Sequence, residues 1–366
     1  NDSGLVFTFN YKNSVLDVTT SNYMGEYDGK KHSGTIKINN ADENECIILY
    51  DDDEKIDESQ EKEGKTERLE TTYSIAFPEM ISVNGGDVYG HDTIGAFIEG
   101  RNVTLSDFSI SKYLVTRDLY FKVMYDDKDV NAWPSRCEYN QTYRGEIMEG
   151  EKDSLRPVES VSWFDAVYFC NRLSKIKGYE PVYSISDIKR NTVYSIISAT
   201  VSQDLTKNGY RLPTETEWEY AARGGDVTVE DWNFYYSGAD SENAGAAIDS
   251  GMDAVGWYNC NAETGVTTRR NPSTMHGSHQ VGLKKPNRLG VYDMSGGIFE
   301  WCWDWEHAIS TGSTLDPVGP DSGGKKVLRG GSWLHGWAIY CGVRLRLSSE
   351  PQTSTDYYGF RIARSK

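Results

Sequence analysis

The stretch Asn208-Gly-Tyr-Arg-Leu-Pro-Thr-Glu-Thr-Glu-Trp-Glu-Tyr-Ala-Ala-Arg-Gly-Gly225 predicts a helix that begins beside Pro213 and Thr214. Pro213 suits the first helical turn because a missing N–H costs nothing there, and the hydroxyl of Thr214 can cap the helix. Three carboxylates follow near the positive end of the helix dipole, namely Glu215, Glu217 and Glu219. Paired carboxylates can also perform acid–base chemistry, but no histidine lies nearby in the sequence, so we favour the structural role.

Two further helices are predicted upstream of this stretch. Residues 116–125 place apolar side chains at helical spacing after Thr116, which can act as a cap. Residues 162–174 show a clearer pattern, with Gly178 near the expected end. Strands are predicted at 73–77, at 108–112 and, as a pair separated by two glycines, within 80–90. Two modest helices in a long, Trp-rich and irregular chain predict an α+β domain dominated by loops.

The first 71 residues differ in amino-acid composition from the rest of the chain. Short β-branched and aromatic runs at 5–10, 34–39 and 46–50 predict a small β-rich region over residues 1–50. Residues 51–71 are dense in acidic side chains and almost free of apolar ones, which predicts a flexible acidic linker. Residues 72–366 then form the main domain.

The composition excludes several classes of protein. The net charge of -17 over 366 residues argues against binding to duplex nucleic acid. The basic pairs Lys284-Lys285 and Lys325-Lys326 are isolated and read as solvated loop charges. Six cysteines without a C-x-x-C motif predict mostly buried free thiols rather than a zinc module or a disulfide scaffold. No apolar run reaches the length of a membrane span.

Five motifs occur in a fixed order along the main domain: Asn208–Gly225, Ala254–Tyr258, Val281–Trp301, Val327–Trp333 and Gly359–Arg361. The glycines at 330, 331 and 359 read as tight turns or close approaches of the backbone. Together the motifs resemble the formylglycine-generating-enzyme, or sulfatase-modifying-factor, family over residues 72–366. The resemblance implies a loop-rich C-type lectin fold.

The segment from Asp293 to Glu300 is a candidate calcium site. Both carboxylates are hard oxygen ligands, and glycines between them let main-chain carbonyls turn inward. The resemblance implies a structural calcium ion held by the side chains of Asp293 and Glu300 and by the carbonyls of Gly296 and Ile298. The alternative is that Glu300, beside Trp301, is a buried acid paired with an arginine.

Only one of the two catalytic cysteines of the resembled family has a match in this chain. Enzymes of the resembled family bind copper through two cysteines that follow a Gly-Gly-Ser-aromatic sequence. Here Cys341 matches the second cysteine, whereas His335 stands at or beside the first. One thiolate and one imidazole make an incomplete copper site, so we expect neither copper nor catalysis and interpret Cys341 as a packed core thiol.

The C-terminal region, about 327–366, resembles the variable region of proteins diversified by retroelements, most of all the variable proteins of Treponema. Such elements randomise adenines in Asn codons, so diversified positions can become small, apolar or hydroxylic residues. Compatible positions are Leu334, His335, Ile339, Leu345, Leu347, Ser348, Ser349, Thr353, Ser354 and Asp356. Gly336, Trp337 and Tyr357 complete the predicted ligand-binding surface.

The sequence therefore predicts a non-catalytic binding protein whose C-terminal region varies its specificity. The resemblance implies display at the cell surface as a lipoprotein, with membrane contact only through a lipid anchor. The expected partner is a protein or another surface ligand. Two alternatives remain: a sulfatase-modifying-type oxidase that uses Cys341 and His335, and a lectin-like accessory module of fixed specificity.

Overall fold

The computed structural model describes residues 75–135, 150–243, 247–261, 277–334 and 336–366, together with four short strands nearer the N-terminus. Contacts divide the chain into two units, Asn1–Ser74 and Ile75–Lys366. In the first unit β1 (Phe9–Tyr11) pairs antiparallel with β2 (Ser14–Leu16), and β3 (Val18–Ser21) with β4 (Thr35–Ile38). The predicted run at 46–50 and the acidic linker lie outside the described residues.

Two helices of the second unit begin and end where the sequence predicts. The helix α1 (Arg117–Met124) is capped by Thr116, whose hydroxyl accepts a hydrogen bond from Leu119 N. The helix α2 (Trp163–Lys177) begins with a reciprocal capping box between Ser162 and Asp165 and ends at Gly178 in the left-handed conformation.

The helix predicted from the opening motif is α3 (Glu215–Ala222), capped by Thr214. Glu217 closes a capping box on Thr214, so one of the three carboxylates acts locally. Pro213 precedes the cap and lies two positions before Glu215, the first helical residue, so the prediction that it belongs to the first turn is wrong. A fourth helix, α4 (Ser250–Val255), has no clear signal in the sequence because it spans only six residues.

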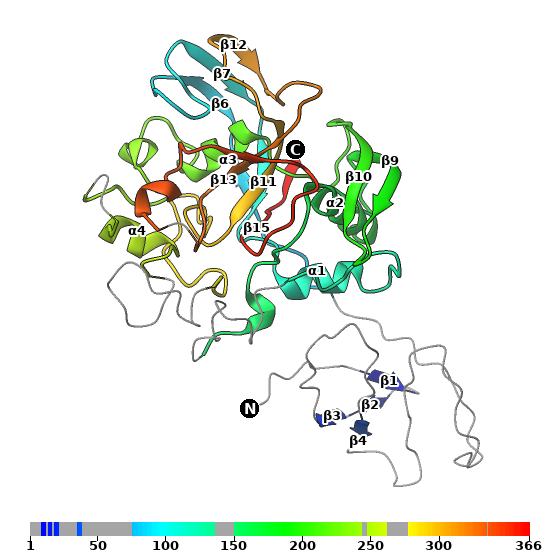
Figure 1. The fold of residues 1–366 in the computed structure, drawn as a ribbon. Coiled ribbons are helices and arrows are strands. Elements are labelled where there is room, and N and C mark those ends of the chain that lie inside the picture. The colour runs from blue at the N-terminus through cyan, green and yellow to red at the C-terminus, as the bar shows by residue number, and fades with distance from the viewer. Residues whose placement is uncertain are drawn as a thin grey trace, which may run out of the picture. The chain divides into compact units, whose positions relative to one another are not determined.

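A four-stranded sheet forms the centre of the second unit (Figure 1). Its order is β14 (Leu347–Ser349), β13 (Lys326–Arg329), β11 (Phe299–Trp305) and β15 (Tyr358–Gly359). The β11–β15 pair is parallel and the other two pairs are antiparallel. In Figure 1, α2 lies on one side of β11 and α4 on the other.

Smaller sheets surround the centre. The first joins β12 (Gly312–Leu315), β7 (Arg101–Leu105) and β6 (Gly86–Tyr89), and the second joins β16 (Ala363–Ser365), β8 (Phe108–Ser111) and β5 (Met80–Val83). A hairpin of β9 (Tyr183–Arg190) and β10 (Ile196–Gln203) packs beside α2. Short 3₁₀ turns are η2 (Asp153–Leu155), η3 (Glu230–Asn233) and η4 (Ala338–Cys341).

The strand predictions within 80–90 and at 108–112 are confirmed by β5, β6 and β8. The strand predicted at 73–77 is wrong over its described residues, since 75–77 are irregular. Pro78 follows at once and has no N–H for a ladder, which explains why pairing starts only at Met80.

Tryptophans join the layers of the core. Trp163, Trp218 and Trp301 are all fully buried. The indole of Trp163 donates to the carbonyl of Cys302, and that of Trp301 donates to the carbonyl of Val161. These bonds connect α2 and the turn before it to β11, so each buried N–H has a partner.

Lys326 overturns the expectation of a solvated loop charge. Its side chain is fully buried, and its Nζ lies 4.0, 4.6 and 3.8 Å from the ring centroids of Trp163, Trp303 and Trp305. The same nitrogen donates to the carbonyl of Trp303 at 2.7 Å. A cation over three indole faces is attracted by each ring, so this lysine is part of the core. Lys325, next to it, is exposed.

Candidate functional site: the C-terminal binding segment

The binding segment, defined here as residues 334–357, leaves the central sheet and returns to it. It follows the end of β13, includes η4 and β14, and stops where β15 begins. Glu300 in β11 is the register partner of both Arg329 and Gly359, so the strands on either side of the segment, β13 and β15, meet at one residue. The scaffold, meaning the described residues of the second unit outside the segment, therefore fixes both ends.

Next to the start and the end of the segment, the backbone of a glycine approaches its neighbours closely, as predicted. Gly331 has a φ of +81°, and a Cβ there would lie 2.7 Å from the sulfur of Cys341. A Cβ on Gly359 would lie 2.3 Å from the carbonyl oxygen of Val158. Any larger residue at either position would have to displace the backbone or the core.

Side-chain burial along the segment separates two kinds of position. The described positions of the predicted ligand-binding surface are exposed or half-buried: Leu334, Gly336, Trp337, Ile339, Leu345, Leu347, Ser348, Ser349, Thr353, Ser354, Asp356 and Tyr357. Six residues between or directly after them are buried: Ala338, Cys341, Gly342, Val343, Pro351 and Tyr358. The other residues between them are exposed or half-buried: Tyr340, Arg344, Arg346, Glu350, Gln352 and Thr355. His335 lies outside the described residues. Leu334 and Leu347 are the most open of the apolar positions predicted to vary.

Main-chain atoms hold the segment in place. Donors of the scaffold reach the carbonyls of Ile339, Pro351, Thr355, Asp356 and Tyr357 at distances of 3.1, 2.9, 2.9, 3.3 and 2.8 Å. Val343 N donates in turn to the carbonyl of Tyr235 at 2.9 Å. These bonds use the backbone of the segment, so they do not depend on which side chain it carries.

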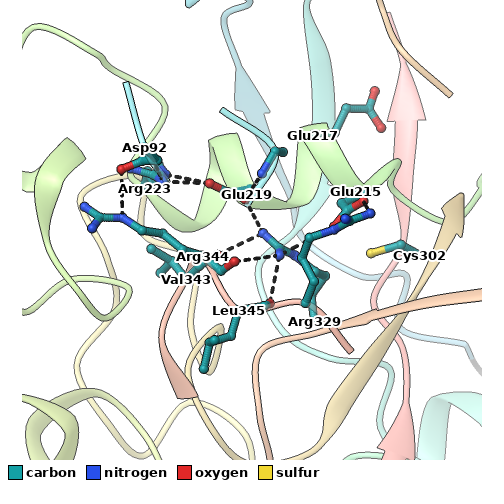
Figure 2. Close-up of polar contacts among 12 residues, drawn as sticks. Asp92, Glu215, Glu217, Glu219, Arg223, Cys302, Arg329, Val343, Arg344 and Leu345 are labelled. Carbon is teal, nitrogen blue, oxygen red and sulfur yellow. Dashed lines mark hydrogen bonds and ion pairs between the residues drawn. The ribbon is translucent and has the colours of Figure 1, made fainter. Parts of the chain in front are cut away.

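A buried arginine supplies the densest of these contacts (Figure 2). Arg329, at the end of β13, donates to the carbonyls of Val343 and Leu345 at 2.9 and 2.8 Å. The same guanidinium is ion-paired with Glu219 on α3, and both side chains are fully buried. Burial alone would raise the pKa of Glu219, but the neighbouring Arg329 and Arg223 lower it below its ordinary value, so the carboxylate stays ionised.

Two arginines of the segment bind acids of the scaffold. Arg344 Nε lies 3.2 Å from Asp92 Oδ1, and Asp92 also accepts a bond from Arg223. Arg346 NH2 donates to Glu215 Oε2 at 2.8 Å. The acids of α3 are thus committed to structural ion pairs, which supports their predicted structural role.

The sequence did not reveal this network, because its members are far apart in the chain. Glu219 and Arg223 are four residues apart on α3, a spacing that favours an ion pair and is the one local signal of the network. Arg329, by contrast, lies 110 residues from Glu219.

Cys341 is packed in the core of the second unit. It is fully buried beneath Gly331, and burial raises the pKa of its thiol to about 12. Cys170 and Cys302 are likewise buried free thiols, whereas Cys260 is partly exposed. A thiol with such a raised pKa carries almost no thiolate near neutral pH, and the thiolate is the form that binds metals.

The candidate calcium ligands differ from one another in the structure. Asp293 adopts a φ of +59°; its Oδ2 accepts a bond from Gly282 N, and its buried Oδ1 has no hydrogen-bond partner. Burial raises the pKa of Asp293 to about 6. One oxygen of Asp293 therefore remains available to a cation.

Glu300 does not fit the same ligand set. Its Oε2 accepts bonds from the indole of Trp218 and from Arg361 Nε, and its Oε1 accepts from Arg361 NH2. This is the arginine pairing that the sequence left open as an alternative. Over the part of the chain that the structure describes, no three His, Cys, Asp or Glu side chains lie together as a metal site. The described helices also include none long and apolar enough to cross a membrane.

Comparisons with known proteins agree with this architecture. Residues 65–366 match the family described as sulfatase-modifying factor enzyme 1-like domain. "Chaperone protein LppX" of Paenibacillus barcinonensis is 35% identical over 70% of this chain and 79% of its own. "Formylglycine-generating enzyme" of Thermomonospora curvata is 28% identical over 78% of this chain and 92% of its own. The solved structure of "Treponema denticola variable protein 1" superposes with a TM-score of 0.62 at 32% identity, covering 81% of this chain and 98% of that one.

Proposed function

Because the chain belongs to the sulfatase-modifying factor enzyme 1-like family and buries the one cysteine that matches that chemistry, we propose that it is a non-catalytic binding protein. Its ligand would contact the binding segment, residues 334–357. The observation that carries the proposal is the burial pattern: no described position predicted to vary is buried, while Ala338, Cys341, Val343 and Pro351 between them are buried. Loops on a rigid scaffold are well suited to recognition.

Diversification by a retroelement is the finer part of the proposal. It is supported by the main-chain anchoring of the segment, which lets side chains change without loss of the bonds that position them. It is also supported by the likeness to a solved protein whose name describes it as variable. Display at the cell surface through a lipid anchor is also part of the proposal, and it rests on the resemblance stated for the C-terminal region.

We retain a structural calcium ion as part of the proposal, with a smaller ligand set. Asp293 Oδ1 would bind the ion together with the carbonyls of Gly296 and Ile298, and Glu300 would remain with Arg361. Hard oxygen ligands of this kind are the ones calcium prefers. In this role the ion would compensate the buried charge of Asp293 and brace the turn before β11.

A pair of variant libraries tests whether the segment is exchangeable. The first randomises Leu334, Ile339, Leu347, Thr353 and Ser354 among small, apolar and hydroxylic residues. The matched library randomises the buried residues Ala338, Val343, Pro351, Tyr358 and Phe360 in the same way. Most members of the first library should keep their melting temperature within about 5 °C, whereas most members of the second should unfold, because cavities and overpacking act only in the core. Equal losses in both libraries would contradict exchangeability.

Genomic copies test diversification itself. Near-identical copies that differ only within 334–357, beside a reverse transcriptase gene, are the expected finding. Copies that are identical throughout this range in many isolates would instead indicate the accessory module of fixed specificity.

A further inference from the structure

The hairpin of β9 and β10, which lies beside α2 (Figure 1), ends in a turn whose apolar side chains face solvent. Val193 and Tyr194 follow each other in this turn and are 44% and 53% exposed. Ile197, three positions further on, is 40% exposed, although Ile196 beside it is fully buried. Five consecutive residues span at most about 14 Å, so these side chains belong to one small area. We call residues 191–197 the hairpin tip.

The hairpin tip is held in one conformation by Asn191. Its Oδ1 accepts hydrogen bonds from Val193 N and Ser195 N, both at 3.0 Å. Asn191 N donates to the carbonyl of Ser195 at 3.0 Å, and Tyr194 N donates to the carbonyl of Asn191 at 3.1 Å. Because the turn is already ordered, a partner that covers its apolar side chains pays little additional conformational entropy.

Tyr194 is an unusual residue for its place in the turn. It adopts a φ of +62°, in the left-handed region that favours glycine and asparagine. A bulky aromatic residue there costs stability, and such strain is concentrated at functional positions. The exposed ring is therefore better explained by contact with a partner than by the stability of the turn.

The hairpin is basic, in contrast to the chain as a whole. The chain has a net charge of -17, yet the charged residues within 188–203 are Lys189 and Arg190. Lys189 is exposed, and its register partner is Ser198, the residue after Ile197. A cation thus lies across the hairpin from the apolar area. The last turn of α2, which packs against β9, adds two exposed basic residues, Lys175 and Lys177.

The acids next to the hairpin do not cancel this charge. Asp165 accepts a bond from Ser195 Oγ at 2.6 Å, but it is buried and does not face solvent. Glu180 is ion-paired with Lys207 at 2.7 Å. Asp187 is the one acid within β9. An anionic surface would be attracted to this part of the domain and repelled by the net charge of the rest.

An apolar tip beside basic side chains matches the boundary of an anionic bilayer. Aliphatic side chains can enter the headgroup region, and tyrosine is enriched there because its ring is apolar and its hydroxyl polar. Lysines near the surface are attracted by anionic headgroups. A duplex nucleic acid would attract the same lysines but would leave Val193 and Ile197 in water.

We propose that the hairpin tip inserts into the headgroup region of an anionic lipid bilayer, with Lys189 beside the lipid phosphates. The resemblance implied membrane contact only through a lipid anchor, so the hairpin tip would be a second contact that needs no anchor. It uses no residue of the binding segment, residues 334–357, and does not depend on the function proposed for it. Apolar burial and electrostatic attraction would act together at this contact.

The test is co-sedimentation of the full chain, without a lipid, with vesicles of phosphatidylcholine that contain about one third phosphatidylglycerol. Tyr194→Asn should lower the partition coefficient at least about fivefold, because it removes the ring that would be buried. Its melting temperature should stay the same or rise, since asparagine tolerates a positive φ. The matched control is Tyr89→Asn at a tyrosine of β6 that is also exposed, and this variant should bind vesicles like the wild type.

A second pair of variants tests the charge. Lys189→Met should lower binding to the anionic vesicles about fivefold, the contribution expected of one lysine near such a surface. Lys325→Met, at an exposed lysine just before β13, should leave binding unchanged. Vesicles of phosphatidylcholine alone should bind the wild-type chain more weakly than the anionic vesicles do.

Three outcomes would overturn the inference. The first is a wild-type chain that does not sediment with anionic vesicles, whether or not duplex DNA binds the hairpin instead. The second is vesicle binding that neither Tyr194→Asn nor Lys189→Met weakens, which would place the membrane contact elsewhere. The third is equal binding to neutral and anionic vesicles, because Lys189 would then have no role. The function proposed for the binding segment would stand in each case, since its libraries are tested by melting temperature.

Discussion

Arg329 and Glu219 form a fully buried ion pair, and the same guanidinium binds two carbonyls of the binding segment. The pair thus lies both in the core and at the base of the binding face. Removing Arg329 would leave the buried carboxylate of Glu219 with one guanidinium, that of Arg223, in place of two, and it would also leave two carbonyls without their donor.

We expect Arg329→Met to lower the free energy of unfolding by about 3–5 kcal/mol, measured by urea denaturation of the full chain. Arg344→Met is the matched control. The Arg344 side chain is partly exposed, so its loss should cost about 1 kcal/mol or less. Equal effects of the two substitutions would show that the buried pair does not support the segment.

Cys341 should be chemically inert in the folded chain. Burial raises the pKa of its thiol to about 12, so a thiol reagent at pH near 8 should label the partly exposed Cys260 well before Cys341. Labelling sites are identified by mass spectrometry of digests. Copper-dependent oxygen consumption that disappears in Cys341→Ala would instead support the alternative that the chain is a sulfatase-modifying-type oxidase.

Asp293 should make the stability of the chain dependent on calcium and pH together. Its pKa is raised to about 6 by burial, above the ordinary value of 3.8, so without a cation its stabilising contribution is present at low pH and is lost as the pH rises through 6. Calcium should therefore raise the melting temperature at pH near 7.5 and have little effect at pH near 4, where Asp293 is protonated.

The control for the calcium experiment is Asp293→Asn, which keeps the shape and removes the charge. This variant should melt at a temperature that neither calcium nor a chelator changes. A wild-type chain whose melting temperature is unaffected by chelation at neutral pH would exclude the proposed ion.

Lys326 should titrate unlike an ordinary lysine. Burial lowers its pKa to about 7, so the folded chain holds this proton less tightly than the unfolded chain does. Stability should consequently rise with pH between about 7 and 10, and Lys326→Met should remove this rise, measured as the difference in unfolding free energy from the wild type. Lys325→Met, at the exposed neighbour, should keep the pH dependence of the wild type.

Local signals in the sequence predicted the local features of the structure. Thr116, Ser162 and Thr214 cap the three longer helices because a cap depends on only a few neighbouring residues. The close backbone approaches at Gly331 and Gly359 were also predicted, since the short motifs around these glycines indicate them.

Relations between distant residues were not predictable in the same way. Lys326 lies beneath three tryptophans that are brought together by α2 and β11, and no short window of sequence contains them. The choice for Glu300 between a cation and an arginine was open for the same reason, because Arg361 is 61 residues away.

The meeting of Arg329 and Gly359 on Glu300 has a consequence for how the chain folds. The strands that come before and after the binding segment, β13 and β15, flank β11, so they are separated by about two strand spacings, roughly 10 Å, whatever the segment contains. The loop-closure entropy depends on this separation and on the length of the loop far more than on its composition. Sequence versions of equal length should therefore refold at nearly the same rate, so a population of variants could be produced without a kinetic penalty on any one of them.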